Sequence, residues 1–157
     1  MRLRFLVLLI SAGVAVQAED YKGPRPPKAD VVYLVHASNL LATEVGSAQQ
    51  EGKNSDTFSM PGPASTVRTP LAEPIFLLRS EKLKPDTLEL YRFEVKNGKR
   101  QVTLSSKRKR GSMGPFHMSI TKLDRDLYRL EASETLENGE YSLIPNGSNT
   151  VFCFEVY

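Results

Sequence analysis

An Asn97-Gly98 pair between two segments of alternating polarity constrains the fold of this chain more than any other feature. Both residues tolerate the positive φ angles of a type I′ turn, and such a two-residue turn fixes the register of the strands on either side. The predicted cross-strand pairs, counted outward from the turn, are Lys96–Lys99, Val95–Arg100, Glu94–Gln101, Phe93–Val102, Arg92–Thr103 and Tyr91–Leu104. The apolar pairs Phe93–Val102 and Tyr91–Leu104 share one face, so we predict an antiparallel hairpin with one buried face within residues 87–106.

Other strand-like segments recur along the chain at short intervals, with turn residues between them. They cover residues 31–35, 40–45, 57–60, 75–78, 116–121, 128–133, 141–143 and 152–156. The segment 75–78 is apolar throughout, which predicts a central strand that is covered on both faces. The polar segment 46–56 predicts a turn region, and no long amphipathic helix pattern is present. This profile is typical of an all-β, antiparallel β-sandwich.

The segment Leu136 to Tyr141 resembles the corner that precedes the penultimate strand in immunoglobulin-like and fibronectin-type-III-like domains. The resemblance implies that Leu136 packs into the core, Gly139 turns the chain, and the hydroxyl of Tyr141 bonds back to the corner backbone. The spacing is one residue shorter than the usual fibronectin pattern, and the chain lacks the Trp and the Cys pair of antibody-type domains. We therefore expect an immunoglobulin-like sandwich without a disulfide. The chain also resembles uncharacterised exported bacterial proteins that end in a Gly-Glu-Tyr strand and a Phe-Cys-Phe strand, which implies no activity.

Residues 1–18 have the order of a cleaved secretory signal peptide. Arg2 and Arg4 precede an apolar run from Phe5 to Val16, and Ala18 stands before an acidic start. That run is shorter than the about twenty residues of a spanning helix, so an uncut anchor is the weaker interpretation, and no other stretch is long enough to span a membrane. We expect cleavage after Ala18, export to the periplasm or beyond, and no transmembrane segment in the mature protein.

Removal of the signal peptide changes the charge of the protein. The 21 basic residues include Arg2 and Arg4, and all 18 acidic residues follow Ala18, so the mature chain of 139 residues carries a net charge of +1. This value removes the main support for a general polyanion-binding role. We expect a Pro-rich lead-in over residues 19–29 and a single β-sandwich domain over residues 30–157.

The sequence shows no recognisable catalytic, cofactor or metal motif. His36 and His117 are far apart and have no paired ligand nearby, and Asp124 and Asp126 are interpreted as turn residues. A Gly-x-Ser-x-Gly elbow and a Gly-rich phosphate loop are both absent. Cys153 lies within a strand-like run, where we expect a buried side chain; an intermolecular disulfide or a reactive thiol is the alternative. A Cys–His pair would require His36 or His117 to meet Cys153 in the fold. We therefore expect no catalytic residue, cofactor or metal.

A basic run formed by Lys107, Arg108, Lys109 and Arg110 is the surface feature that stands out. It follows the second hairpin strand, so it is predicted to lie in a loop at the pole opposite the Asn97-Gly98 turn. The run is typical of a solvated loop, and its functional interpretation is contact with an anionic envelope polymer, an acidic protein patch or lipid headgroups. Nucleic acid is not expected, because no aromatic residues are interleaved with these charges.

These observations favour a non-catalytic interaction or structural module of the cell envelope. Its partner would be an envelope protein or polymer that the sequence does not identify, and its oligomeric state stays open. A carbohydrate-binding module is the first alternative; with no Trp, it needs a flat row of exposed Tyr and Phe. A small secreted hydrolase is the second, and it needs His36 or His117 beside Cys153 or a serine.

Overall fold

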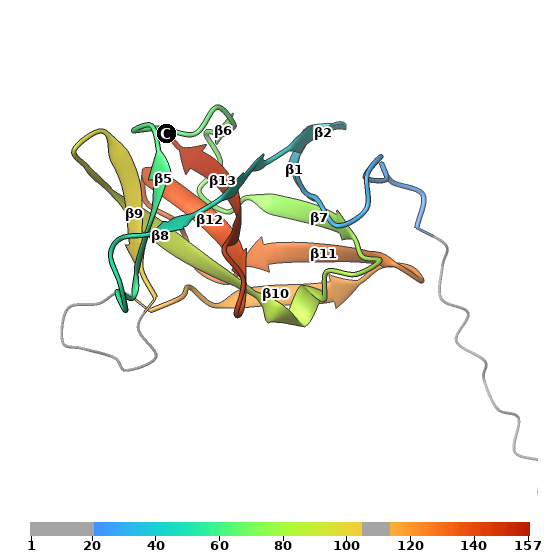
Figure 1. The fold of residues 1–157 in the computed structure, drawn as a ribbon. Helices are drawn as coiled ribbons and strands as arrows, with labels where there is room; N and C mark the ends of the chain where they lie inside the picture. The colour runs from blue at the N-terminus through green and yellow to red at the C-terminus, as the bar shows by residue number, and fades with distance from the viewer. Residues whose placement is uncertain (1–20, 105–113) are drawn as a thin grey trace, which may run out of the picture.

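The computed structural model describes residues 21–104 and 114–157, which fold into two β-sheets packed in a sandwich-like arrangement (Figure 1). One short 3₁₀ helix, η1 (Pro85–Thr87), interrupts the strands, and all neighbouring strand pairs except one are antiparallel. Residues 1–18, which are predicted to be a signal peptide, and the basic run 107–110 lie outside the described residues. Within the described part of the chain, no helix is long and apolar enough to cross a membrane. The prediction of an all-β, antiparallel sandwich is confirmed at this level.

The first sheet has β7 at its centre. Its strands, in spatial order, are β10 (Met118–Lys122), β11 (Leu127–Ala132), β7 (Ile75–Arg79), β1 (Val32–His36) and β2 (Asn39–Ala42). The three middle residues of β7, Phe76 to Leu78, are all buried, so both faces of this strand are covered. The central strand predicted at 75–78 is therefore confirmed.

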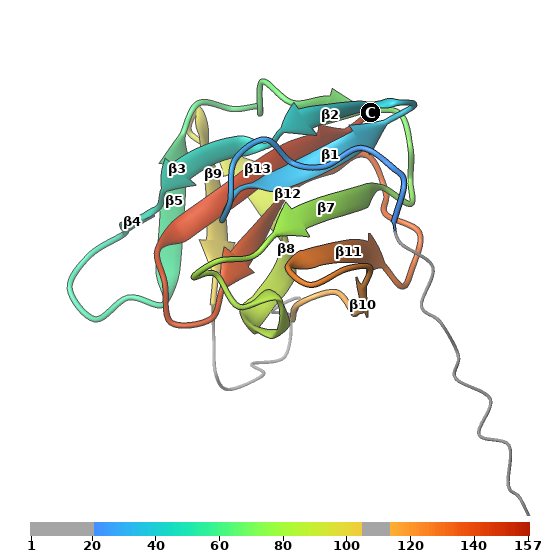
Figure 2. The same cartoon turned by 90° about the vertical axis from the view of Figure 1, so that its right-hand side faces the viewer.

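The second sheet curls round until its two ends meet in one stretch of chain (Figure 2). Its path is β3 (Glu44–Ser47), β13 (Thr150–Val156), β12 (Gly139–Pro145), β8 (Leu88–Lys96), β9 (Lys99–Thr103), β5 (Thr57–Pro61) and β4 (Gln49–Gln50), and β6 (Arg68–Thr69) pairs parallel with β13. Only Ala48 separates β3 from β4, so the seven strands of the path enclose a small barrel. Gly46 faces its interior, because the terminal methyl of Met60 lies where a Cβ would project.

The Asn97-Gly98 hairpin is confirmed. The strands β8 and β9 pair as Glu94–Gln101, Val95–Arg100 and Lys96–Lys99. Asn97 and Gly98 have φ angles of 52° and 72°, as a type I′ turn requires. Tyr91, Phe93 and Val102 are buried, so the apolar face of the hairpin points inward.

Two hydrophobic cores result from the alternation of side chains along the shared strands. Tyr141 and Leu143 of β12 lie in the core between the two sheets, whereas Ile144 on the opposite face of β12 lies inside the barrel. The barrel core comprises Ala48, Met60, Tyr91, Phe93, Val102, Ile144, Val151 and Cys153. Strands β8, β12 and β13 therefore form a wall that is apolar on both sides.

The turn region predicted over residues 46–56 is wrong for its first part. The structure extends β3 to Ser47 and forms β4 at Gln49–Gln50 before the chain turns. Their backbone groups pair with β13 and β5, while the polar side chains of Ser47, Gln49 and Gln50 stay exposed. Tertiary pairing therefore makes a strand where the local sequence is polar enough to predict a turn.

Candidate functional site

A cavity of about 910 Å³ opens at one end of the barrel. The described residues that line it are Asp56, Phe58, Glu89, Tyr91, Leu104, Pro115, Ile144, Pro145, Asn146, Gly147, Ser148 and Asn149. They come from the first residues of β8, the start of β5, the chain after β9 and the β12–β13 turn. The volume lies in the range of small-molecule sites, about 300 to 1,000 Å³.

The strand geometry explains how the cavity acquires an apolar floor and a polar rim. Tyr91 and Ile144 belong to the barrel core, and Phe58 and Leu104 pack against the same core. The β12–β13 turn supplies the rim: Gly147 has a φ of 76°, and the amide of Ser148 donates to the carbonyl of Pro145 at 3.0 Å. This turn lies beside the first residues of β8, and together they form the mouth of the cavity.

A carboxylate and a phenol are paired on the wall of the cavity. The hydroxyl of Tyr91 donates to Oε2 of Glu89 at 2.6 Å, and both side chains project from the same face of β8. Burial, together with the hydrogen bond and the charge of Glu89, raises the pKa of Tyr91. The phenol therefore stays protonated at any physiological pH and holds the Glu89 carboxylate in place. Asp56 adds a second acidic side chain to the lining.

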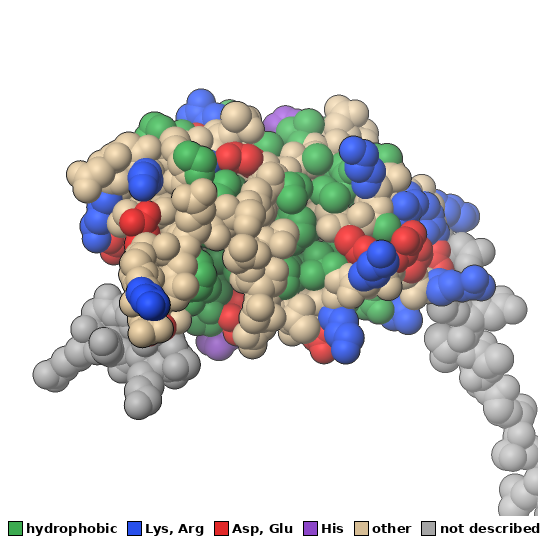
Figure 3. Space-filling model, viewed as in Figure 1, with side chains coloured by type: hydrophobic (Ala, Val, Ile, Leu, Met, Phe, Trp, Pro, Cys, Tyr) green, Lys and Arg blue, Asp and Glu red, His purple; other side chains and the backbone are tan. Residues whose placement is uncertain are grey.

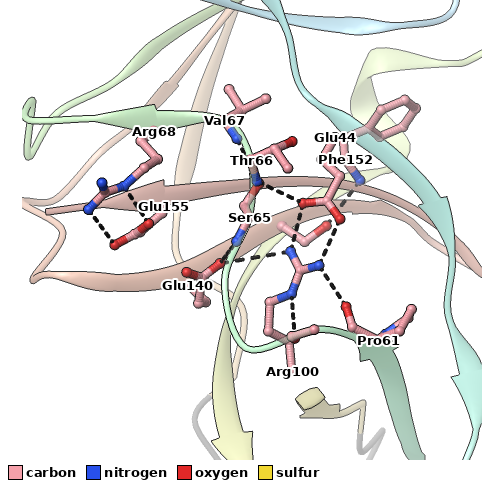
Figure 4. Close-up of polar contacts among 12 residues, drawn as sticks. Glu44, Pro61, Ser65, Thr66, Val67, Arg68, Arg100, Glu140, Phe152 and Glu155 are labelled. Atoms are coloured by element: carbon pink, nitrogen blue, oxygen red, sulfur yellow. Dashed lines mark hydrogen bonds and ion pairs between the residues drawn. The ribbon is translucent and has the colours of Figure 1, made fainter. Parts of the chain in front are cut away.

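The opposite end of the barrel is closed by a buried ion cluster around Arg100 (Figure 4). Nη1 and Nη2 of Arg100 donate to the two carboxylate oxygens of Glu44 at 2.9 and 2.7 Å. Its remaining bonds go to the carbonyls of Pro61 and Gly62, at 3.0 and 3.2 Å. The Arg100 side chain is only 1% exposed, and each of its three guanidinium nitrogens donates at least one hydrogen bond, so the cluster seals this end of the barrel.

Two carboxylates face Arg100 in different environments. Burial alone would raise the pKa of Glu44, but hydrogen bonds from Arg100 and Ser65 outweigh it, and the pKa is lowered. Glu140 accepts a hydrogen bond from the amide of Ser65 at 2.9 Å, yet its nearer oxygen is 3.8 Å from Nη1 of Arg100. Burial therefore dominates and raises the pKa of Glu140. The contacts to Ser65, Pro61 and Gly62 fasten the segment between β5 and β6 to the barrel, which is a structural role.

Cys153 and the two histidines lie in different parts of the molecule. Cys153 is fully buried in the barrel core, and burial raises the pKa of its thiol to about 11. His36 ends β1 and His117 directly precedes β10, and both are exposed at strands of the first sheet. The expected burial of Cys153 is confirmed. The structure brings neither histidine to the buried thiol.

The acidic turn residues Asp124 and Asp126 lie between β10 and β11. Asp124 pairs with Arg25 of the Pro-rich lead-in, which ties that segment to the first sheet. Among the described residues, no group of three or more His, Cys, Asp or Glu side chains is arranged to hold a metal ion.

Two of the corner residues, Leu136 before β12 and Tyr141 within it, are buried, and Gly139, the first residue of β12, is half-buried. Leu136 is 2% exposed and Tyr141 is fully buried. The hydroxyl of Tyr141 donates to the carbonyl of Glu137 at 2.8 Å, and its ring packs between those of Phe116 and Phe154. This bond joins β12 to the corner that leads into it.

A flat aromatic platform is not found on the described surface. The face in Figure 3 shows hydrophobic side chains along its middle and charged side chains mainly toward its two ends. Among the described residues, Tyr157 is the one strongly exposed aromatic side chain, and it lies against Arg68. The described surface of the sheets therefore shows no row of exposed rings on which a sugar chain would stack.

Sequence reasoning missed the residues at both ends of the barrel. Side chains alternate between the two faces of a strand, so Glu89 lies on the same face as Tyr91 and Phe93, and Arg100 lies on the same face as Val102. A charged residue on the predicted buried face is the sequence feature from which both positions could have been identified. Comparison of the chain with protein-family models, with curated proteins and with solved structures finds no match.

Proposed function

We propose that this protein is an exported, non-catalytic binding module of the cell envelope, which holds its partner in the cavity at the Tyr91 end of the barrel. The observation that carries this proposal is the cavity itself, with its apolar floor, polar rim and volume of about 910 Å³. Sites that combine these properties are the ones in which folded proteins bind small molecules or side chains of a partner.

The finer parts of this proposal have separate support. The immunoglobulin-like assignment is supported by the Tyr141–Glu137 hydrogen bond at a corner before the penultimate strand. Export is supported by the charge and apolar order of residues 1–18. A binding role without catalysis is supported by the separation of His36 and His117 from Cys153.

The basic run 107–110 belongs to the proposal as a second contact. Leu104 and Pro115, which stand before and after it in the chain, both line the cavity. An anionic envelope polymer or acidic protein patch would be its partner chemistry. Replacing residues 107–110 with Ser tests this part separately: unchanged retention by envelope fractions would remove the run from the proposal.

Retention of the purified protein by isolated envelope fractions tests the cavity. Asn146→Trp places a bulky ring on the exposed rim, and Ser119→Trp places the same ring on exposed β10 of the other sheet. We expect the Asn146 variant to lose most of its retention and the Ser119 variant to keep it, with both unfolding at the wild-type temperature. Equal retention of the two variants would overturn the proposal.

A further inference from the structure

We infer that the cavity takes an organic cation, in particular an alkylammonium group carried on an apolar stem or ring. This inference rests on the proposed function, because it names the chemical class that the same cavity would bind. It is carried by the charge of the lining, by the apolar floor and by the fixed position of the Glu89 carboxylate.

The described part of the lining is acidic. Asp56 and Glu89 are its two charged side chains, and this part includes no Lys, Arg or His. Neither carboxylate forms an ion pair with another described residue; the pairs that do form involve other acids. These two carboxylates would repel an anionic ligand, whereas they would attract a cation.

The floor matches the apolar part of such a ligand. Phe58 and Tyr91 provide aromatic rings, and Leu104 and Ile144 provide aliphatic side chains. Apolar stems gain free energy when they leave water for such a surface, and an ammonium group is attracted to the face of an aromatic ring. An apolar floor beside acidic side chains of the lining therefore accommodates both halves of an alkylammonium ligand.

The Glu89 carboxylate is already fixed in position by a hydrogen bond before any cation binds. Its carboxylate accepts the 2.6 Å hydrogen bond of Tyr91, whose raised pKa keeps the donor protonated. A carboxylate that is already positioned loses less conformational freedom when a cation binds. Asn146 and Asn149 add amide groups at the rim, which provide further acceptors for N–H groups.

The test is a titration of the purified protein with small-molecule probes. Binding is measured by calorimetry and by changes in amide chemical shifts. Phenethylamine provides the cation on a ring, and phenethyl alcohol provides the same shape without charge. Nα-acetyl-lysine methylamide carries the same ammonium group on a peptide unit, which distinguishes a free amine from a partner's lysine. Cellobiose serves as the neutral sugar probe.

We expect one or both amines to bind more tightly than phenethyl alcohol, and to shift the signals of residues 144–149. Glu89→Gln keeps an acceptor for Tyr91 but removes the charge, so it should weaken amine binding by about tenfold. Glu94→Gln is the matched control, because Glu94 lies on the same strand but is exposed on the outer face. Added salt should weaken the amine and leave the alcohol unchanged.

Equal binding of amine and alcohol, binding of cellobiose alone, or equal effects of the Glu89 and Glu94 variants would overturn the inference. Amine binding that appears only after residues 107–110 are replaced with Ser would also overturn it for the native chain. If no amine binds while Asn146→Trp still abolishes envelope retention, the cation assignment fails and the proposed function stands. If Asn146→Trp leaves retention unchanged, the proposed function fails.

Discussion

The guanidinium of Arg100 and the carboxylate of Glu44 form a two-bonded ion pair at the closed end of the barrel, with N–O distances of 2.7 and 2.9 Å. The pair joins β9 to β3, two strands that are not neighbours in the sheet. Arg100 is almost fully buried, so its guanidinium has lost its contacts with water. The carboxylate of Glu44 and the carbonyls of Pro61 and Gly62 replace those contacts. The pair therefore holds the curled sheet in its closed form.

Removing the guanidinium should be costly. Arg100→Met leaves Glu44 and Glu140 without their cation, and breaking a buried pair costs about 3 to 5 kcal/mol. Because Glu44 is partly exposed, we expect a loss near the lower figure, measured as the free energy of unfolding in urea. Arg129→Met is the control, since its pair with Glu131 is far more exposed than that of Arg100 and its loss should change stability by less than about 1 kcal/mol. Similar losses in both variants would contradict the structural role of Arg100.

The carboxylates of Glu44 and Glu140 should give opposite pH dependences. The pKa of Glu44 is lowered from its ordinary value of 4.5, so its contribution to stability is present above that value and is lost as the pH falls. The pKa of Glu140 is raised from 4.5, so its contribution is present below that value and is lost as the pH rises through the folded-state pKa.

The paired variants Glu44→Gln and Glu140→Gln measure this difference. The cost of Glu44→Gln should be greatest near pH 7 and shrink toward pH 3.5. The cost of Glu140→Gln should be greatest at the acidic end and shrink as the pH rises above the ordinary value of 4.5 and through the raised pKa of Glu140. Unfolding in urea across this range provides the measurement, and parallel curves for the two variants would show that the two environments are alike.

The corner tyrosine provides a third prediction. Tyr141→Phe removes the hydroxyl bond to Glu137 but keeps the ring between Phe116 and Phe154. We expect a loss of about 0.5 to 1.5 kcal/mol in the free energy of unfolding. Tyr128→Phe serves as the control, because no hydrogen bond of its hydroxyl to another described residue is found. A Tyr141→Phe variant as stable as the control would argue against a corner bond.

The thiol of Cys153 should be inert in the folded protein. Its side chain is fully buried and its pKa is raised to about 11, so the reactive thiolate is scarce at pH 8. We expect negligible reaction with 5,5′-dithiobis(2-nitrobenzoate) under native conditions and one thiol per chain after denaturation. Rapid native reaction, or a disulfide-linked dimer on a non-reducing gel, would contradict the burial.

The sequence predicts the fold best where local and tertiary preferences agree. Asn97-Gly98 sets a register by turn geometry, and the apolar pattern of 75–78 predicts a central strand without knowledge of its neighbours. Residues 46–50 lack this agreement. Their local sequence is polar and predicts a turn, whereas they form strands because they pair with β5 and with β13, which is distant in the sequence. The curling of the second sheet depends on that pairing.

The candidate site was less predictable because it depends on which strand ends meet. Glu89, Asp56 and Asn146 are ordinary surface residue types in the sequence, and the fold makes them neighbours around Tyr91. The signal for Arg100 was present in the hairpin register, where a charged residue shares the buried face. A charge at such a position indicates either a buried ion pair or a site, and the structure shows the ion pair.

Mapping the partner's contact surface tests the central claim most directly. Amide spectra of the ¹⁵N-labelled protein, recorded with and without solubilised envelope material, report contacts without choosing a site in advance. The account predicts shifts or broadening at residues 56–58, 89–91 and 144–149, around the cavity. Changes confined to the β10 edge or to the Asn97-Gly98 turn, with the cavity signals unmoved, would contradict it.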